Sequence, residues 1–379
     1  MRVAVDALPL LTPSTGIAHY TRELMRRVGR AADVELFFCY GLYWGRELRE
    51  KPLPYFDNLR TSARAAIPST RALYRLVRQA VFSAGVLRRR IDLHHAPNFL
   101  PSRFSGPIVI TVHDLSFLKY PETHPEDRVR HMNKFLPSAI ERASFILVDS
   151  EFVRQEVLSQ FSISEEKVVT TLLGVSERFR AMPSEHTAAV LAKHKLARGG
   201  YILSVGTLEP RKNLLRTLEA YGSLPPATRK AFPLALVGTA GWRMEAMQDR
   251  LTALVRSGDV RLLGYVAQEE LPALYAGAAA FVYPSLYEGF GLPVLEALAS
   301  GAPTVTSNRG ALLEIAGDAA VTVEPEDPLA IRQGLEAVLE PSPERDERVA
   351  RGVAWARTFT WERCAEQTIQ VYRRAVGQA

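Results

Sequence analysis

Residues 281–308 read FVYPSLYEGFGLPVLEALASGAPTVTSN, and their pattern indicates the fold of the second half of the chain. A β-type run that ends at Tyr283 is followed by a glycine-rich turn at 288–291 and then by a helix. Pro293 suits the start of that helix, where its missing N–H costs nothing. A second strand is expected at 303–306, so the stretch predicts a βαβ unit with glycines between its first strand and its helix.

The turn between this strand and its helix is suited to a phosphate. A helix N-terminus presents unpaired N–H groups and a partial positive charge, and glycine at 289 and 291 lets a phosphate approach the backbone closely. Glu288 and Glu296 are eight positions apart and would flank that phosphate. Because a diphosphate repels carboxylates, each glutamate is better explained as an acceptor for hydroxyl groups. The predicted ligand has a central diphosphate and a hydroxyl-rich ring at each end, as a nucleotide-sugar has.

The whole phrase resembles the Glu-x7-Glu segment of the retaining family-4 glycosyltransferases, whose GT-B fold consists of two facing Rossmann-like domains. The resemblance implies an α/β protein with two parallel sheets and an interdomain cleft. It extends over residues 201–318 and, more loosely, over residues 2–174. A pair of solvated side chains on a helical segment is the alternative interpretation of the two glutamates.

The length of the chain predicts two domains, because 379 residues exceed one usual domain. The stretch at 179–197 lacks strand patterns and leads into a new strand, so the boundary is expected near Ala181. We expect residues 1–180 to form an acceptor-binding domain and residues 181–360 to form a donor-binding domain, both Rossmann-like. In the resembling family a last helix, expected here at about 361–379, packs back on the first domain.

Composition restricts the function classes further. With 47% hydrophobic and 23% charged residues this is an ordinary globular chain. It lacks an apolar run long enough to span a bilayer and starts with a strand instead of a signal peptide, so a cytoplasmic location is expected. Cys39 and Cys364 are too few for a disulfide framework or a cysteine metal site. We expect no metal and no cofactor besides the substrate, because cations and a helix N-terminus can neutralise the diphosphate and no Asp-x-Asp motif is present.

Positive charge is concentrated in residues 46–90, which have eleven Lys or Arg and three acidic residues, a local net charge of +8 against +6 for the whole chain. The segment lacks interleaved aromatic residues and nucleic-acid motifs, so no nucleic acid partner is expected. An anionic membrane surface or a diphosphate lipid fits better, which would place the protein on the inner face of the cell membrane. A helix packed on its own domain is the alternative. The cations considered are Arg71, Arg75 and Arg78, beside an apolar face of Ile67, Leu73, Leu76, Val77, Val81, Phe82 and Val86.

Other strand-to-helix turns also carry glycine. Gly16 follows the first strand, where it either lets a phosphate or sugar lie against the backbone or marks a simple tight turn. In the resembling family the residues that match Gly264 and Tyr265 hold the nucleotide base. The resemblance thus implies a donor site composed of Gly16, Gly206, Thr207, Gly238, Gly264, Tyr265, Glu288, Gly289, Phe290, Gly291, Leu292 and Glu296.

Four residues are expected to act in catalysis: His113, Arg211, Lys212 and Glu288. His113 ends a strand, at the edge of a parallel sheet where ligands bind, and the VHDLSF phrase resembles one in which a histidine contacts the donor sugar. Arg211 and Lys212 suit a diphosphate leaving group, whose charge grows as the sugar bond breaks. The commonest family form has an arginine where this chain has Thr207, and Arg211 is the cation here. Glu288 is expected to hold the sugar hydroxyls.

These expectations describe a retaining hexosyltransferase. The phrases SVGTLEPRKN and VHDLSF resemble bacterial mannosyl- and rhamnosyltransferases of O-antigen and exopolysaccharide assembly, which implies GDP-mannose as donor and a saccharide or lipid-linked saccharide as acceptor. A UDP-sugar, with glucose or a hexosamine, is the alternative donor. A nucleotide-sugar 2-epimerase would need a carboxylate set to deprotonate the sugar, and a non-catalytic sugar-binding protein would normally be exported.

Overall fold

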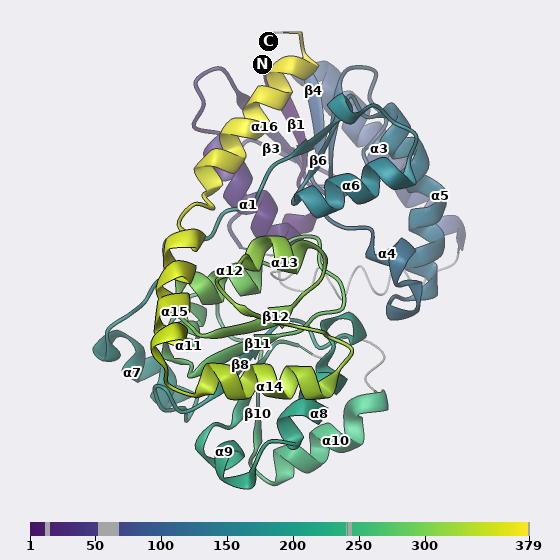
Figure 1. Cartoon of the computed structure of the whole chain (residues 1–379). Helices are drawn as coiled ribbons and strands as arrows, with labels where there is room; N and C mark the ends of the chain where they lie inside the picture. The colour runs from purple at the N-terminus through teal and green to yellow at the C-terminus, as the bar shows by residue number, and fades with distance from the viewer. Residues whose placement is uncertain (12–15, 52–67, 240, 242–244, 378–379) are drawn as a thin grey trace. The chain divides into compact units, whose positions relative to one another are not determined.

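The computed structural model describes residues 1–11, 16–51, 68–239, 241 and 245–377, and within these it leaves out the side chains of residues 68–72, 245 and 246. The chain forms two compact units (Figure 1), each with its own sheet. The first unit comprises residues 1–115, 130–174 and 361–379, and the second comprises residues 116–129 and 175–360.

The first unit is built on a seven-stranded sheet with the order β3-β2-β1-β4-β5-β6-β7, in which only the edge pair β2·β3 is antiparallel. The strands are β1 (Arg2–Asp6), β2 (Glu35–Cys39), β3 (Trp44–Gly45), β4 (Leu93–Ala96), β5 (Ile108–Val112), β6 (Phe145–Val148) and β7 (Val168–Thr170). The helices are η1 (Leu8–Leu11), α1 (Gly16–Val28), α3 (Pro68–Arg89), most of α5 (Glu126–Arg142), α6 (Glu151–Gln160), η3 (Glu165–Lys167) and α16 (Trp361–Ala375).

The second unit has a fully parallel six-stranded sheet with the order β10-β9-β8-β11-β12-β13, the strand order of dinucleotide-binding Rossmann folds. Its strands are β8 (Ile202–Val205), β9 (Leu234–Val237), β10 (Val260–Gly264), β11 (Ala280–Tyr283), β12 (Thr304–Ser307) and β13 (Val321–Val323). Its helices are α4 (Ser116–Lys119), η2 (Pro121–Thr123), α7 (Ser184–Lys193), η4 (Pro210–Lys212), α8 (Leu214–Gly222), α9 (Pro226–Ala231), α10 (Glu245–Arg256), α11 (Leu271–Gly277), α12 (Leu292–Ala299), α13 (Gly310–Ala316), α14 (Pro328–Leu339) and α15 (Pro343–Ala356).

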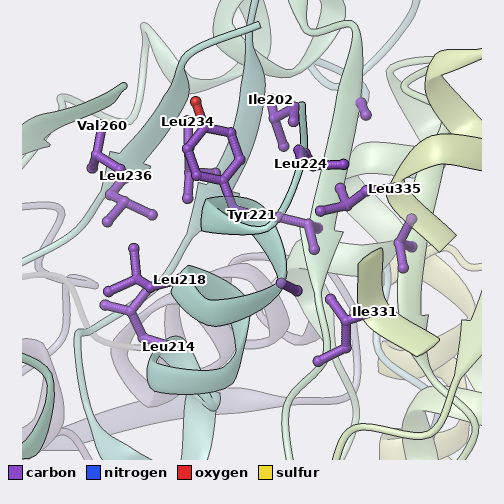
Figure 2. Close-up of a cluster of buried hydrophobic side chains, with 14 of the residues drawn as sticks. Ile202, Leu214, Leu218, Tyr221, Leu224, Leu234, Leu236, Val260, Ile331 and Leu335 are labelled. Atoms are coloured by element: carbon purple, nitrogen blue, oxygen red, sulfur yellow. The ribbon is translucent and has the colours of Figure 1, made fainter. Parts of the chain in front are cut away.

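The core of the second unit lies between its sheet and the helices that cover it. Figure 2 shows leucines of α8 facing Leu234, Leu236 and Val260 of the sheet, with Ile331 and Leu335 of α14 in the same cluster. Each such side chain contributes about 1.5–3 kcal/mol through burial. Tyr221 is fully buried here, and its hydroxyl donates a hydrogen bond to the Asp259 carbonyl oxygen at 2.7 Å.

The strand order of the second unit also positions its site. β8 and β11 are neighbours in the sheet, but the chain leaves β8 towards β9 and leaves β11 towards β12, on opposite sides. The loops after these two strands therefore diverge at the carboxyl edge of the sheet, which is where ligands of Rossmann folds bind.

The last helix, α16, belongs to the first unit, where it packs against α1. A buried hydrogen-bonded chain ties it to the sheet: the Tyr372 hydroxyl lies 2.5 Å from His95 Nδ1, and His95 Nε2 lies 3.0 Å from Thr111 Oγ1. Thr111 in turn lies 2.9 Å from the hydroxyl of Tyr20 on α1. Burial lowers the pKa of His95 to about 3, so this histidine stays neutral within the core.

Two helices of the first unit have clear N-terminal signals. Helix α5 begins at Glu126, because the acidic Glu126 and Asp127 favour a helix N-terminus, and its buried residues include Met132 and Leu136. Helix α6 is capped by Ser150, which accepts a hydrogen bond from the Val153 N–H.

Helix α3 presents two apolar faces where the sequence predicted one. Phe82 and Val86 pack into the core beside Phe37 and Cys39, whereas Leu73, Leu76, Val77 and Leu87 are exposed. Arg78 is not a solvated cation, because its Nη2 lies 2.6 Å from Asp6 Oδ2. Ile67 lies outside the described residues, as does the side chain of Arg71. Within the described part of the chain, no helix is both long and apolar enough to cross a membrane.

Candidate active site

Glycine turns line the carboxyl edge of the second sheet, where β8, β9 and β10 end. The Gly206 N–H donates to the Val237 carbonyl oxygen and the Gly238 N–H donates to the Gly264 carbonyl oxygen, both at 2.9 Å. A Cβ on Gly238 would lie 1.9 Å from the Gly206 carbonyl oxygen, and φ at Gly238 is +145°. Only glycine allows these two turns to touch. A Cβ on Gly264 would meet no atom within 4 Å, so only the φ of +65° favours glycine there.

The turn after β8 is fastened to the turn after β11 by Asn213. This buried residue has a left-handed backbone with φ +60°, which asparagine tolerates. Its side-chain amide donates to the carbonyl oxygens of Pro284 at 2.9 Å and Pro325 at 2.5 Å. The Leu286 N–H also donates to the Arg211 carbonyl oxygen at 2.9 Å. Arg211 and Lys212 are therefore carried on a turn whose position is set by β11.

Three of the four predicted catalytic residues meet at this point. Arg211 Nη1 lies 3.0 Å from Glu288 Oε2, and Lys212 Nζ lies 2.6 Å from Glu288 Oε1. Arg211 also donates to Glu209 Oε1 at 2.8 Å and to the Tyr287 carbonyl oxygen at 2.7 Å. Lys212 donates to the hydroxyl of Tyr283 at 2.7 Å, and that hydroxyl donates to Glu288 Oε1 at 2.9 Å.

The electrostatics of this cluster depend on burial and on the two cations. Burial alone would raise the pKa of Glu288, but Arg211 and Lys212 outweigh it and hold that pKa at about 2. Burial and the nearby Arg211 lower the pKa of Lys212, against the attraction of Glu288. Burial and the Glu288 carboxylate raise the pKa of Tyr283 well above its ordinary value, so its phenol stays protonated. A diphosphate would meet an arginine, a lysine and a neutral hydroxyl here.

The helix N-terminus predicted for phosphate binding is formed by α12. Gly291 precedes the helix with φ +109°, and a Cβ there would lie 2.6 Å from Leu312 Cδ2, so the position requires glycine. Leu292 begins the helix without a side-chain cap. Gly289 and Phe290 are buried in the preceding turn, and the Phe290 ring packs edge-on against Phe359.

Glu296 belongs to a different hydrogen-bonded group from Glu288. Its Oε2 accepts from the hydroxyl of the fully buried Tyr275 at 2.9 Å. Burial raises the pKa of Glu296 to about 7, although the Tyr275 hydrogen bond and the charge of Arg178 oppose that rise. Near neutral pH this carboxyl group is therefore partly protonated, and it can both donate to and accept from hydroxyl groups of a ligand.

His113 lies in the first unit, at the end of β5. Its Nδ1 is 2.7 Å from Asp149 Oδ2, and its Nε2 is 2.8 Å from the Pro97 carbonyl oxygen. Because a carbonyl oxygen only accepts, Nε2 carries a proton. Burial lowers the pKa of His113, but the Asp149 carboxylate and the hydrogen bond to it raise it above the ordinary value overall. Both ring nitrogens are thus engaged with the protein, and the predicted contact with a donor sugar stays a prediction.

The remaining predicted donor residues are exposed. Gly16 is exposed and begins α1, and a Cβ there would meet no atom within 4 Å. Thr207 is exposed, as is Tyr265, with 62% of its surface accessible. None of these positions makes a steric demand for its residue. Among the described residues, no group of three or more His, Cys, Asp or Glu side chains is placed to hold a metal ion.

Sequence reasoning missed several partners of these residues. Glu209 and Tyr283 contact Arg211 and Lys212, and Tyr275 contacts Glu296. Glu209 had a signal, because it lies two positions before Arg211 in the same turn. Tyr283 had a weaker one, as the last residue of a strand that points to the site. Tyr275 had none, since its contact depends on how α11 packs against α12.

Comparison with known proteins identifies the family. Residues 191–354 match the model of glycosyl transferases group 1, and residues 14–178 match that of Glycosyltransferase Family 4. The chain is 38% identical over 386 residues to O-antigen chain mannosyltransferase B of Escherichia coli, and the match covers 98% of this chain and all of that one.

Among solved structures, sucrose-phosphate synthase from Thermosynechococcus elongatus has a TM-score of 0.75 at 20% identity, covering 100% of this chain and 99% of that chain. WaaG, a glycosyltransferase involved in lipopolysaccharide biosynthesis, has a TM-score of 0.72 at 15% identity, with 98% and 99% covered. With these matches, and with two Rossmann-like units of the GT-B class, the chain is a member of the family-4 glycosyltransferases.

Proposed function

We propose that this glycosyltransferase moves mannose from GDP-mannose to a saccharide or lipid-linked saccharide acceptor in cell-surface polysaccharide synthesis, with retention at the anomeric carbon. The donor assignment is supported by the 38% identity to an enzyme named as an O-antigen chain mannosyltransferase. A UDP-sugar is the alternative donor, and the experiment below separates the two.

The observation that carries the proposal is the cluster of Arg211, Lys212 and Glu288 beside the N-terminus of α12. Two cations and a helix N-terminus can neutralise a diphosphate leaving group without a metal ion. A carboxylate held at a pKa of about 2 is ionised at every physiological pH and accepts hydrogen bonds from sugar hydroxyls. From within helix α12, Glu296 offers its carboxyl group to the ribose.

The proposed step exchanges one bond at the anomeric carbon for another. The bond from this carbon to the diphosphate oxygen breaks, and the electron pair leaves with the nucleoside diphosphate. The acceptor hydroxyl oxygen forms the new bond on the same face of the sugar, and its proton passes to the leaving diphosphate oxygen. Arg211 and Lys212 stabilise the negative charge that grows on that group as the first bond lengthens.

The test is nucleotide release from GDP-mannose, with UDP-glucose in parallel. We expect GDP from the wild type and a loss of about 10²-fold or more in rate for Lys212→Ala, the magnitude of removing one electrostatic donor. Lys230→Ala, on the surface helix α9, is the matched control and should leave the rate unchanged. Release of UDP alone would replace the donor assignment. Isomerised sugar without release would indicate an epimerase, and near-wild-type rates in Lys212→Ala would refute the site.

We also propose that the exposed strip of α3 docks on an anionic membrane surface. Leu73, Leu76 and Leu87 are 61%, 69% and 80% exposed, at spacings that place them on one side of the helix. Arg88 is exposed next to Leu87, and Arg75 is exposed on the helical turn that carries Leu73 and Leu76. An apolar strip flanked by cations is the pattern of helices that lie in a membrane interface, where anionic headgroups attract the charges.

Sedimentation with lipid vesicles tests this docking. We expect binding to vesicles that contain phosphatidylglycerol and little binding to phosphatidylcholine alone. The double substitution Leu76→Ser with Leu87→Ser should weaken binding, whereas Leu329→Ser, at a 56% exposed leucine on α14, should not. Unchanged vesicle binding in the double variant, or a change only in its oligomeric state, would contradict the membrane role.

A further inference from the structure

The carboxylate of Glu288 occupies the hydrogen-bonding positions that a diphosphate needs. Its Oε1 accepts from Lys212 Nζ at 2.6 Å and from the Tyr283 hydroxyl at 2.9 Å, and its Oε2 accepts from Arg211 Nη1 at 3.0 Å. Glu288 is only 9% exposed. Both cations that are proposed to hold the diphosphate are therefore held by the residue that is proposed to hold the sugar.

The other partners of these cations come from the turns that carry them. Glu209 lies two residues before Arg211 in the same turn and binds its Nη2, whereas Glu288 binds its Nη1. Lys212 donates to the hydroxyl of Tyr283, and its ammonium lies 5.3 Å from the centre of that ring. These contacts can persist while the side chain of Glu288 moves.

Charge balance makes the contacts of Glu288 incompatible with a bound diphosphate. Two carboxylates and two cations give the cluster of Glu209, Arg211, Lys212 and Glu288 a net charge of zero. A diphosphate brings further negative charge to the same donors, and like charges about 4 Å apart near a protein surface repel by about 4 kcal/mol. Either Glu288 or the diphosphate must give way.

We propose that Glu288 is the internal counter-ion of Lys212 and Arg211 in the empty site, that the donor diphosphate displaces it, and that Glu209 and Tyr283 remain as positioning residues for the two cations. The inference rests on the nucleotide-sugar function proposed above. Displacement releases both oxygens of Glu288 to accept hydrogen bonds from the sugar hydroxyls. Binding of the diphosphate thereby prepares the contact with the sugar.

The test is GDP binding to the full chain by calorimetry, with no acceptor present. Glu288→Gln keeps the shape of the side chain but removes the competing charge, so GDP should bind about tenfold more tightly or better, the size expected when hydrogen bonds to a charged group no longer have to be broken. Its transferase rate should fall, because the sugar loses the charged acceptor and one of the two accepting oxygens. Tighter product binding with slower transfer is a combination that mere structural damage would not produce.

Three further variants separate the roles. Glu209→Gln and Tyr283→Phe should each weaken GDP binding, by about three- to tenfold, because Arg211 and Lys212 lose a fixed partner. Glu270→Gln is the matched control. It removes an equally charged carboxylate that also pairs with two basic side chains, Lys193 and His194, and should leave GDP affinity unchanged.

The outcomes distinguish this inference from the proposed function. Unchanged or weaker GDP binding by a folded Glu288→Gln overturns the counter-ion role, as does tightening in Glu209→Gln equal to that in Glu288→Gln. Should Glu288→Gln fail to fold, Glu288→Asp decides: its shorter side chain reaches the cations less well, so GDP should again bind more tightly than to the wild type, and weaker or equal binding refutes the role. A wild type that binds neither GDP nor UDP would overturn the proposed donor function itself.

Discussion

Replacing Glu296 by glutamine should stabilise the ligand-free protein, and only at the higher end of the pH range. Burial raises the pKa of this carboxyl group from 4.5 to about 7. The folded state therefore keeps its proton where the unfolded state has lost it. Stability is lost as pH rises from about 4.5 to about 7, and the loss stays constant above that range.

The magnitude follows from the same numbers. Each pKa unit corresponds to about 1.4 kcal/mol, so the full difference is worth about 3 kcal/mol above pH 7. Glu296 is half-buried, and solvent screening reduces the expected value to about 2 kcal/mol. Glutamine cannot ionise, but its amide oxygen can still accept the hydrogen bond from Tyr275. Glu296→Gln should therefore match the wild type near pH 4.5 and exceed its free energy of unfolding by about 2 kcal/mol at pH 8.

Urea unfolding followed by circular dichroism between pH 4.5 and 8.5 measures this difference. Glu288→Gln is the control with the opposite sign. In the wild type, Arg211 and Lys212 hold the pKa of Glu288 at about 2, so this carboxylate contributes stability above pH 4.5 that is lost as pH falls towards 2. That variant should be less stable than the wild type at pH 8. A difference between Glu296→Gln and the wild type that does not grow from pH 4.5 to pH 8 would refute the buried, protonated state of Glu296.

Four further substitutions test the local geometry. Gly238→Ala should abolish folding or lower the thermal midpoint steeply, because its Cβ would collide with backbone. Gly264→Ala, where a Cβ has no neighbour within 4 Å, should cost only about 1–2 kcal/mol of backbone strain. Equal thermal midpoints of the two variants would contradict the contact between the two turns. Asn213→Ala should destabilise the protein by about 2–3 kcal/mol through the loss of two buried hydrogen bonds, and a thermal midpoint within experimental error of the wild type would be inconsistent with them. Asp149→Asn removes the charge that keeps the pKa of His113 raised, so burial should bring that pKa below its ordinary value of 6.5. The variant should therefore have a lower free energy of unfolding than the wild type, and this deficit should be larger at pH 5.5 than at pH 8.5. A deficit that does not depend on pH would show that the pair does not share a proton.

Much of the donor site could be predicted because its signals are local. Glu288 and the glycines of its turn lie within a few residues of a strand and a helix start, and Arg211 and Lys212 hold the corresponding place after β8. Strand runs and helix caps determine such positions without knowledge of distant contacts. The resemblance to a known family then added the roles, which local patterns do not carry.

Because these patterns are local, they could not predict which face of α3 packs against the sheet. Helical periodicity shows that Leu73, Leu76, Phe82 and Val86 belong to apolar stripes. It does not show on which side the sheet lies. Only packing placed Phe82 and Val86 in the core and left Leu73 and Leu76 exposed. Arg78 could not be assigned to Asp6 for the same reason, since 72 positions separate them in the chain.

Local sequence patterns were enough to predict the alternation of strands and helices, the two Rossmann-like units and the turns that carry the reactive groups, because each depends on residues close together in the chain. Only the packed fold shows that Lys212 meets Tyr283 and Glu288, which lie 71 and 76 positions later. That meeting follows from the adjacency of β8 and β11 in the sheet. Strand order is a property of the whole packed unit, and it brings to Glu288 the cations that keep this carboxylate ionised. Glu296 lies only a few residues away in the chain, but burial keeps its carboxyl group partly protonated.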